Sequence, residues 1–163
     1  MLIIVEGNEG TGKTTLINEI IKKLPCVVVK YPKEVKNTRL LLEKLIYSGQ
    51  TVICDRSFIT DIVYRLWDKK SPQMSLYDIS ALLHNYSESI KVIFCENKNS
   101  FNNSQIRGED FITDKKVYNE INENFARIKT LLELFTEVKI YNYDYEYDNV
   151  DNVINFIGEE YVD

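Results

Sequence analysis

The chain has few of the residues that interrupt regular structure. Only 6 of its 163 residues are glycine and 3 are proline, which excludes collagen-like and low-complexity architectures. The three cysteines, Cys26, Cys54 and Cys95, are odd in number and lie in or beside apolar, strand-like runs. No metal-type spacing links them, which speaks against a zinc site, and their odd number does not suggest a disulfide framework. We expect buried, reduced thiols.

Two further absences narrow the class of protein. No apolar run is long enough to span a bilayer, and the first residues lack the basic segment of a secretory signal. We therefore expect a cytoplasmic protein with no membrane partner, or one of the host cytoplasm if the chain is viral. An excess of positive charge is also missing, since the formal net charge is -5. This speaks against a nucleic-acid polymer as partner, whereas a small phosphorylated ligand needs only a local cluster of cations.

Short apolar runs alternate with amphipathic runs along the whole chain. The expected strands lie at about 2–6, 27–30, 51–54, 92–95 and 138–143. The expected helices span about 13–24, 34–48, 57–66, 75–83, 113–137 and 148–160. At the start of the fourth helix, Ser75 followed by Asp78 is typical of a capping box. Strands separated by helices predict an α/β fold with a parallel sheet covered on both faces. The length suits one domain, over 1–163.

The strongest local pattern is a glycine-rich loop between the first strand and the first helix. Residues Gly7–Thr14 match G-x-x-x-x-G-K-[ST], in the strand-to-helix context that phosphate binding requires. We call this segment the P-loop. We expect an exposed Lys13 to reach the β- and γ-phosphates of ATP, and Thr14 to ligate Mg²⁺. The ATP-binding residues that we predict are Gly7, Asn8, Glu9, Gly10, Thr11, Gly12, Lys13, Thr14 and Thr15.

The residues around this motif resemble the phosphate loop of thymidylate kinases. The run from Glu6 to Thr15 has the family's acidic residue before the first glycine and a carboxylate, Glu9, two residues after it. The resemblance implies that Glu9 lies near the deoxyribose 3′-hydroxyl of the acceptor. Thr11 is not basic, which is similar to the family members whose extra catalytic arginine lies in the lid.

The segment after the third expected strand carries a second resemblance. Asp55, Arg56 and Ser57, followed by a helix that includes Tyr64, are similar to the Asp-Arg-Tyr segment of the same kinases. The resemblance implies that Asp55 holds magnesium, directly or through water, and that Arg56 bridges the phosphates. It also implies that Tyr64 and Asp61 bind the acceptor, with Tyr64 beside the sugar, where it excludes a 2′-hydroxyl. Ser57 is closer to the deoxynucleoside kinases, so the segment is shared by both families.

The residues after the second expected strand separate these two families. Lys30, Tyr31 and Pro32 resemble an Arg-Phe-Pro segment whose basic residue binds the acceptor phosphate, which implies that role for Lys30. Deoxynucleoside kinases keep a catalytic glutamate just before the proline, where this chain has Tyr31. A hydroxyl acceptor benefits from a general base, whereas a phosphate acceptor is already anionic. The tyrosine therefore favours a monophosphate kinase.

Two other regions bear on the resemblance. A polar stretch without periodicity, at about 97–113, resembles the lid of these kinases, and Arg107 is its only arginine. The resemblance implies that Arg107 reaches the transferring phosphoryl group when the lid closes. The region between the second and third strands is shorter than in thymidylate kinases and lacks their base-stacking aromatic and base-reading arginine. We weigh Arg39 as a substitute, and this leaves base preference and the usual dimer interface open.

The resemblance covers most of the chain. It predicts a P-loop NTPase three-layer sandwich, with a five-stranded parallel sheet of order 2-3-1-4-5 and a lid. We predict ATP- and Mg²⁺-dependent phosphorylation of a deoxynucleoside 5′-monophosphate, with dTMP to dTDP as first choice. The loop at about 142–144 should contact the adenine, and the predicted catalytic residues are Lys13, Asp55, Arg56 and Arg107. A deoxynucleoside kinase and a nucleotide-binding protein without kinase activity stay open as alternatives, as does a homodimer.

Overall fold

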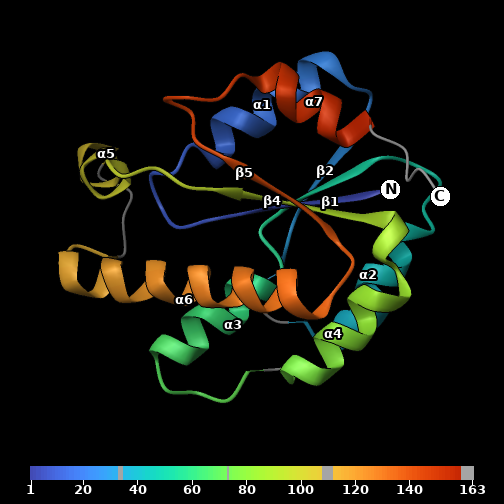
Figure 1. The fold of residues 1–163 in the computed structure, drawn as a ribbon, viewed down its shortest axis with the longest axis horizontal. Coiled ribbons are helices and arrows are strands. Elements are labelled where there is room, and N and C mark those ends of the chain that lie inside the picture. Colours follow the sequence, from blue (N-terminus) through green and yellow to red (C-terminus); the bar gives the residue numbers. More distant parts are fainter. Residues whose placement is uncertain (33–34, 73, 108–111, 159–163) are drawn as a thin grey trace.

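The computed structural model describes residues 1–32, 35–72, 74–107 and 112–158, with all their side chains except those of Leu76 and Arg107. Strands and helices alternate along the chain (Figure 1). The strands are β1 (Leu2–Glu6), β2 (Val27–Lys30), β3 (Val52–Asp55), β4 (Ile90–Cys95) and β5 (Lys139–Tyr143). The helices are α1 (Lys13–Lys23), α2 (Thr38–Ile46), α3 (Phe58–Trp67), α4 (Leu76–Asn85), α5 (Ser100–Arg107), α6 (Lys115–Phe135) and α7 (Val150–Gly158), with a 3-10 turn η1 (Ser87–Ser89).

The five strands form one parallel sheet. Their order is β2-β3-β1-β4-β5, and each neighbouring pair is parallel. The predicted α/β class and strand order are therefore confirmed. Because β1 is the central strand, the P-loop leaves the sheet at the middle of its carboxyl edge. Ligands of open parallel sheets bind beyond this edge.

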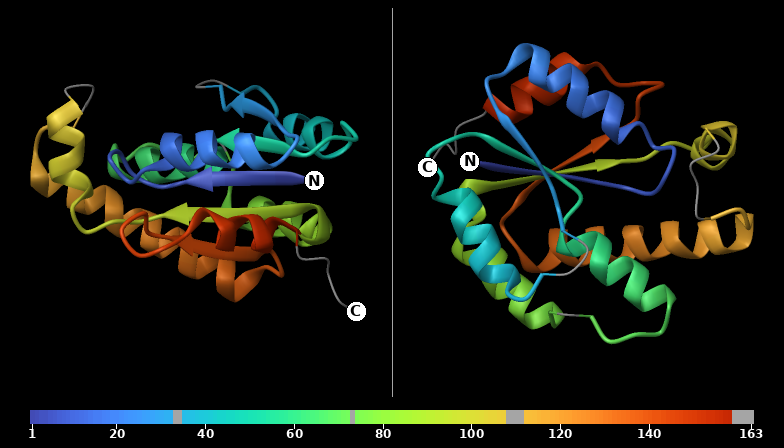
Figure 2. Two further views of the ribbon diagram at one scale, coloured as in Figure 1. Left: turned by 90° about the horizontal axis from the view of Figure 1, so that it is seen from above. Right: turned by 180° about the vertical axis from the view of Figure 1, so that it is seen from behind.

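Helices cover the sheet in two layers. Figures 1 and 2 show α1 and α7 on one face, and α2, α3, α4 and α6 on the other. The remaining helix, α5, lies beyond the carboxyl ends of the strands and beside the first turns of α6. Each layer encloses its own apolar core, one centred on Leu2, Ile4 and Cys54 and the other on Ile3, Val5 and Ile53. Within the described ranges, no helix has the length and apolar content that a bilayer crossing requires.

Short polar side chains define where most helices begin. The N-cap side chains that accept a backbone N–H bond belong to Asn37, Ser57, Ser75 and Asp114. The capping box of Ser75 and Asp78 is confirmed, with both reciprocal hydrogen bonds present. The cap at Asn37 moves the start of α2 from the predicted residue 34 to Thr38, because the Asn37 side chain accepts from the Leu40 N–H at 2.9 Å.

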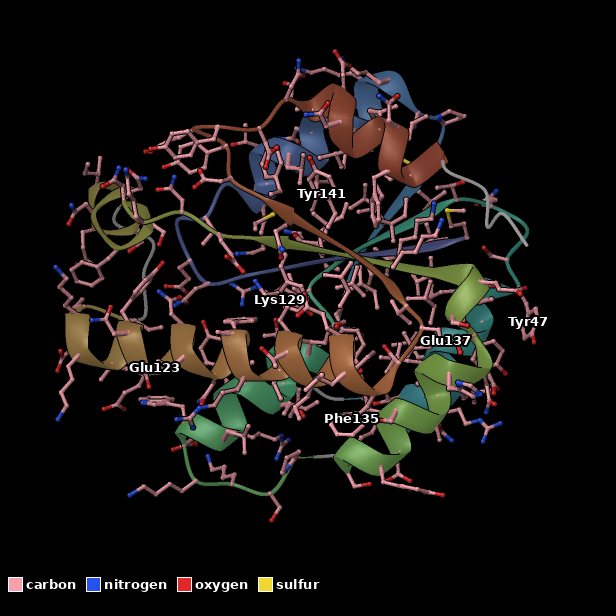
Figure 3. All side chains as sticks on the ribbon, in the orientation of Figure 1. Tyr47, Glu123, Lys129, Phe135, Glu137 and Tyr141 are labelled. Atoms are coloured by element: carbon pink, nitrogen blue, oxygen red, sulfur yellow. The ribbon has the colours of Figure 1, made fainter. Side chains whose placement is uncertain are left out.

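Side chains fill the space between the sheet and the helices that cover it (Figure 3). The core includes the charged side chain of Lys91. Lys91 in β4 is 0% exposed, and its Nζ donates to the carbonyl oxygens of Phe156 at 2.7 Å and Ile157 at 3.0 Å. These carbonyls belong to the last turn of α7, where a helix has acceptors without intrahelical partners and its dipole favours a cation. Lys91 therefore caps the carboxyl end of α7 from the sheet.

Candidate functional site

The P-loop is pressed between the end of β4 and the start of α5. Gly7 has φ +140, and a Cβ placed on it would lie 2.3 Å from the Cys95 carbonyl oxygen. Gly10 has φ +72, and its Cβ would lie 2.1 Å from the Ser100 carbonyl oxygen. Side chains at these positions would be both strained and in collision with backbone atoms. Glycines at these two positions therefore let the loop pass closely between two other backbones.

The amino end of α1 is open at the bottom of this loop. Its N-cap is Gly12, which is in the left-handed conformation and has no side chain to cap the helix. By contrast, α2, α3, α4 and α6 each begin with a side-chain cap. The first N–H groups of an α-helix have no intrahelical partners, and the dipole adds partial positive charge there. The open end of α1 therefore suits an anion such as phosphate.

Lys13 lies at this open end, but not as we expected. We expected Lys13 to be exposed, but only 8% of its surface is exposed in the structure. The expectation is therefore wrong. Its Nζ donates to the Asn8 carbonyl oxygen inside the loop. Burial and the charge of Arg56 lower the pKa of Lys13 to about 8. The lysine folds back into the loop because the Asn8 carbonyl offers an acceptor there.

Asp55 and Arg56 follow β3 at the same edge of the sheet. In register, Asp55 lies between Val5 of β1 and Lys30 of β2. Arg56 has φ 70, which is uncommon for a residue with a side chain, and its N–H donates to the Val5 carbonyl oxygen at 3.0 Å. Strained backbone of this kind persists only where the surroundings hold it, and it clusters at functional sites. The turn directs the Arg56 side chain toward Tyr64.

Arg56, Tyr64 and Glu9 form a half-buried cluster beside the P-loop. Burial alone would lower the pKa of the Arg56 guanidinium, but the adjacent Tyr64 hydroxyl and the nearby carboxylates of Glu6 and Glu9 raise it. Burial raises the pKa of the Tyr64 hydroxyl, while the charge of Arg56 opposes that rise. The structure therefore brings together three predicted site residues that are far apart in the sequence.

Glu6 belongs to the same cluster, and the sequence analysis did not place it among the site residues. It is the last residue of β1, is 0% exposed, and accepts hydrogen bonds from Ser57 Oγ and Thr60 Oγ1, both at 2.6 Å. Ser57 is the N-cap of α3 and directly follows Arg56. Glu6 thus holds the amino end of α3, directly after Arg56. Its position at the end of a buried strand, directly before the loop, was the signal available in the sequence.

Replacing Glu6 with glutamine should change how stability depends on pH. Burial raises the pKa of the Glu6 carboxyl, although its hydrogen-bond donors and the charges of Arg56 and Lys13 act to lower it. A carboxyl group whose pKa is raised in the folded state stabilises the protein at pH values below its ordinary pKa. This stabilisation is lost as the pH rises through the raised pKa. The free energy of unfolding of Glu6→Gln, relative to wild type, should therefore increase from pH 4 toward pH 7. Urea titrations across this range measure the free energy of unfolding of both proteins. A difference that does not change with pH would contradict a raised pKa of Glu6.

The other predicted acceptor residues have contacts of their own. Arg39 is on α2, pairs with Glu43 at 2.8 Å, and lines a cavity of about 540 Å³ shared with α4. Asp61 pairs with Arg65 along α3 at 2.7 Å. Lys30 is exposed at the end of β2, and the described residues include no ion-pair partner for it. The roles of these residues stay predictions.

The predicted lid is only partly within the described residues. Its first part is not aperiodic as we expected, since α5 forms over Ser100–Arg107. Phe101 and Ser104 of this helix pack inward, with Ser104 1% exposed. Residues 108–111 and the Arg107 side chain lie outside the described parts, so the role of Arg107 stays a prediction.

The β5–α7 connection packs against the end of the P-loop at Gly12. A Cβ on Gly12 would lie 2.9 Å from the Tyr145 ring, and the Tyr145 hydroxyl bonds to Asn97 at 3.2 Å and to Asn103. Asn97 also donates to Asp144 at 2.7 Å. These bonds join α5 to Asp144, within the range 142–144 that we predict to contact the adenine. Tyr145 was not among the predicted site residues, because its contact with Gly12 joins positions that are far apart in the sequence.

The donor set at the sheet edge fits Mg²⁺. Thr14 is exposed in the first turn of α1, and Asp55 is partly exposed at the end of β3. The described residues contain no cluster of three or more His, Cys, Asp or Glu side chains that would bind a metal without a nucleotide. Mg²⁺ commonly keeps several waters and takes one or two protein oxygens plus substrate phosphates. Hydroxyl and carboxylate oxygens beside a phosphate site suit that chemistry.

The sheet order, the P-loop and the open amino end of α1 define a P-loop kinase-like α/β fold. The chain is similar to the YorR protein of Bacillus subtilis, solved in complex with phosphorylated GDP, with 19% identity, a TM-score of 0.73, and coverage of 96% of this chain and 93% of that chain. It is also similar to deoxyadenosine kinase from M. mycoides with bound dATP, with 18% identity, a TM-score of 0.67, and coverage of 98% and 100%. The same enzyme with dCMP and a flexible dCDP bound gives 18% identity, a TM-score of 0.59, and 96% coverage of both chains.

At these identities the likeness shows a shared fold. No protein-family model matches the chain, and no curated protein matches it significantly.

Proposed function

We propose that the chain catalyses ATP- and Mg²⁺-dependent phosphorylation of a deoxynucleoside 5′-monophosphate, with dTMP as the first acceptor to test. The observation that carries the proposal is the open amino end of α1, where Gly12 leaves the helix uncapped and Lys13 lies beside it. Arg56 supplies a second cation at the same sheet edge. Phosphoryl transfer depends mainly on positioning the reactants and on neutralising the charge of the phosphates.

Each residue of the site has a definite part in this reaction. The first N–H groups of α1 and the Lys13 ammonium bind the phosphates of ATP, for which Lys13 leaves the Asn8 carbonyl. Thr14 and Asp55 would hold Mg²⁺, which would supply positive charge beside the phosphates. Arg56 lies between the P-loop and Tyr64, and stabilises the phosphoryl group as it moves toward the acceptor. The lid's Arg107 adds a further positive charge on closure.

The acceptor side supports a phosphate rather than a hydroxyl acceptor. Tyr31 occupies the position where a nucleoside kinase would keep its general base, and its hydroxyl lies 3.2 Å from Thr38 Oγ1. Burial raises the pKa of the Tyr31 hydroxyl, so it is not a base at neutral pH. Lys30, one residue earlier, is exposed and adjacent in register to Asp55. We assign the Glu9 carboxylate and the Tyr64 ring to the acceptor sugar.

The solved structures favour a second candidate, a deoxynucleoside kinase. Two of the similar structures are of deoxyadenosine kinase, one with dATP and one with dCMP and dCDP. The first experiment is therefore a coupled assay with Mg-ATP over all nucleosides and nucleoside monophosphates. Preference for a monophosphate supports the proposal, preference for a nucleoside supports the second candidate, and ATP binding without transfer to any acceptor indicates a binding protein.

Replacing Lys30 with methionine should separate the two kinases. A charge-assisted contact with the acceptor phosphate contributes about 1.5–3 kcal/mol. The KM for dTMP should therefore rise roughly ten- to a hundredfold in Lys30→Met, with the KM for ATP nearly unchanged. Phosphorylation of thymidine should barely respond, because a nucleoside has no phosphate for Lys30 to bind.

The matched control is Lys44→Met, which removes an exposed lysine of α2. Clear preference of the wild type for thymidine, together with no response to Lys30→Met, would overturn the monophosphate assignment.

A further inference from the structure

The first turns of α6 hold the outer arm of the P-loop. Asn8 is 1% exposed, and its Nδ2 donates to Asn122 Oδ1 at 2.8 Å and to the Tyr118 carbonyl oxygen at 3.3 Å. The Tyr118 hydroxyl donates to the carbonyl oxygen of Glu9. Three hydrogen bonds thus join one helix to two consecutive residues of the loop. These hydrogen bonds are shielded from solvent, since Tyr118 is itself 1% exposed.

Both backbone polar groups of Glu9 are held by this arrangement. Its N–H donates to Asn8 Oδ1 at 2.9 Å, and its carbonyl oxygen accepts from the Tyr118 hydroxyl. With both groups bonded, the peptide planes on either side of the Glu9 Cα cannot rotate freely. The direction in which the Glu9 side chain leaves the loop is therefore set by Tyr118 and by Asn8, whose own side chain is held by Asn122 of α6. This matters because glycine at position 10 would otherwise leave the arm flexible.

The Glu9 side chain leaves the loop toward the acceptor side. The Glu9 carboxylate is near enough to Arg56 and Tyr64 that its charge raises the pKa of each. These are the residues to which the proposed function gives the transferring phosphoryl group and the acceptor sugar. A change in the backbone of Glu9 would therefore change the geometry of the acceptor pocket and leave the open end of α1 in place.

Tyr118 also contacts the lid. The ring of Phe101, in α5, meets the Tyr118 ring edge-on, with the ring centroids 5.2 Å apart. Figures 1 and 2 show α5 and the start of α6 side by side, beyond the carboxyl edge of the sheet. Tyr118 is thus the residue at which the lid helix, α6 and the P-loop meet.

We propose that Tyr118 is a positioning residue for the acceptor: its hydroxyl holds the Glu9 carbonyl and so directs the Glu9 carboxylate at the acceptor sugar. The proposal rests on the kinase function proposed above. It concerns one hydrogen bond, and the Tyr118 ring has a separate, structural part in the core. The conservative variant Tyr118→Phe keeps the ring and removes only the hydroxyl.

The test compares Tyr118→Phe with Tyr86→Phe. Tyr86→Phe also removes a tyrosine hydroxyl, which donates to Glu43 of α2 at 2.9 Å, away from the P-loop. In Tyr118→Phe the KM for the acceptor should rise about three- to tenfold, as expected for the loss of one neutral hydrogen bond. The KM for ATP should stay within about twofold, since the α1 end and Lys13 are untouched. Tyr86→Phe should change neither constant.

A modified acceptor makes the test specific to Glu9. An acceptor that lacks the 3′-hydroxyl has no group for the Glu9 carboxylate to bind, so wild type and Tyr118→Phe should use it with equal KM. A KM increase of the same size on both acceptors, or for ATP and acceptor alike, overturns the positioning role and leaves the kinase function standing. An unchanged acceptor KM also overturns it.

Failure of the kinase function can be recognised separately. If the wild type transfers phosphate to no acceptor, the proposed function fails, and calorimetric binding of dTMP and its 3′-deoxy analogue replaces the KM values. Weaker binding of dTMP alone by Tyr118→Phe still supports the positioning role. Equal binding by both proteins, or no binding of dTMP by the wild type, overturns it.

Discussion

Replacing Lys13 with methionine should lower the turnover number by about three orders of magnitude or more. One preorganised charge-stabilising donor contributes about two to three orders, and Lys13 is the donor that lies inside the P-loop at the open end of α1. The fold should survive, because methionine fills a similar volume and removes a buried ammonium whose pKa is lowered to about 8. A coupled assay gives the turnover number, and thermal unfolding gives the stability.

Lys22→Met is the control for Lys13→Met. It removes an exposed lysine from the same helix, where Lys22 pairs with Glu19 at 2.6 Å, and it should leave turnover unchanged. Turnover of Lys13→Met within a few-fold of the wild type would contradict the kinase assignment. Comparable losses in both variants would mean that α1 tolerates no lysine replacement, and that Lys13 has no special part.

Replacing Arg56 with alanine should lower the turnover number by about two orders of magnitude. Alanine keeps a Cβ at φ 70, so the strain of this backbone remains and the variant tests the guanidinium alone. The control is Arg127→Ala, on the exposed side of α6. A rise confined to the KM for ATP, with an unchanged turnover number, would make Arg56 a binding residue rather than a catalytic one.

The arrangement of the sheet could be predicted because the sequence patterns that indicate it involve residues that are close together in the chain. Each strand is a short apolar run, and each lies close to the predicted range, although β4 begins at Ile90 rather than at residue 92. The P-loop was equally accessible, since its glycines, Lys13 and Thr14 are consecutive. Where the prediction of a boundary failed, as at α2, the cause was a single cap, Asn37, that the apolar periodicity does not report.

The contacts that hold the candidate site together could not be predicted in the same way. Glu6 meets Ser57 across 51 positions, and Asn8 meets Asn122 across 114. Asparagine and serine in such places look like ordinary loop or cap residues until the fold brings their partners near. Lys13 shows a related limit. The motif indicates which residue binds phosphate, but not where its side chain lies before phosphate binds. Its burial follows from the Asn8 carbonyl that the folded loop presents.

The lysine inside β4 has a consequence for how the chain is made. Lys91 precedes its two carbonyl partners by 65 and 66 residues, so β4 leaves the ribosome well before α7 exists. An ammonium enclosed without a partner costs several kcal/mol, and a nascent chain therefore gains little by closing that face of the sheet early. The face of the sheet that includes Ile93 and Cys95 should stay solvated, and accessible to chaperones, until α7 has been synthesised and packs on it. The order of assembly of this layer then follows the order of synthesis.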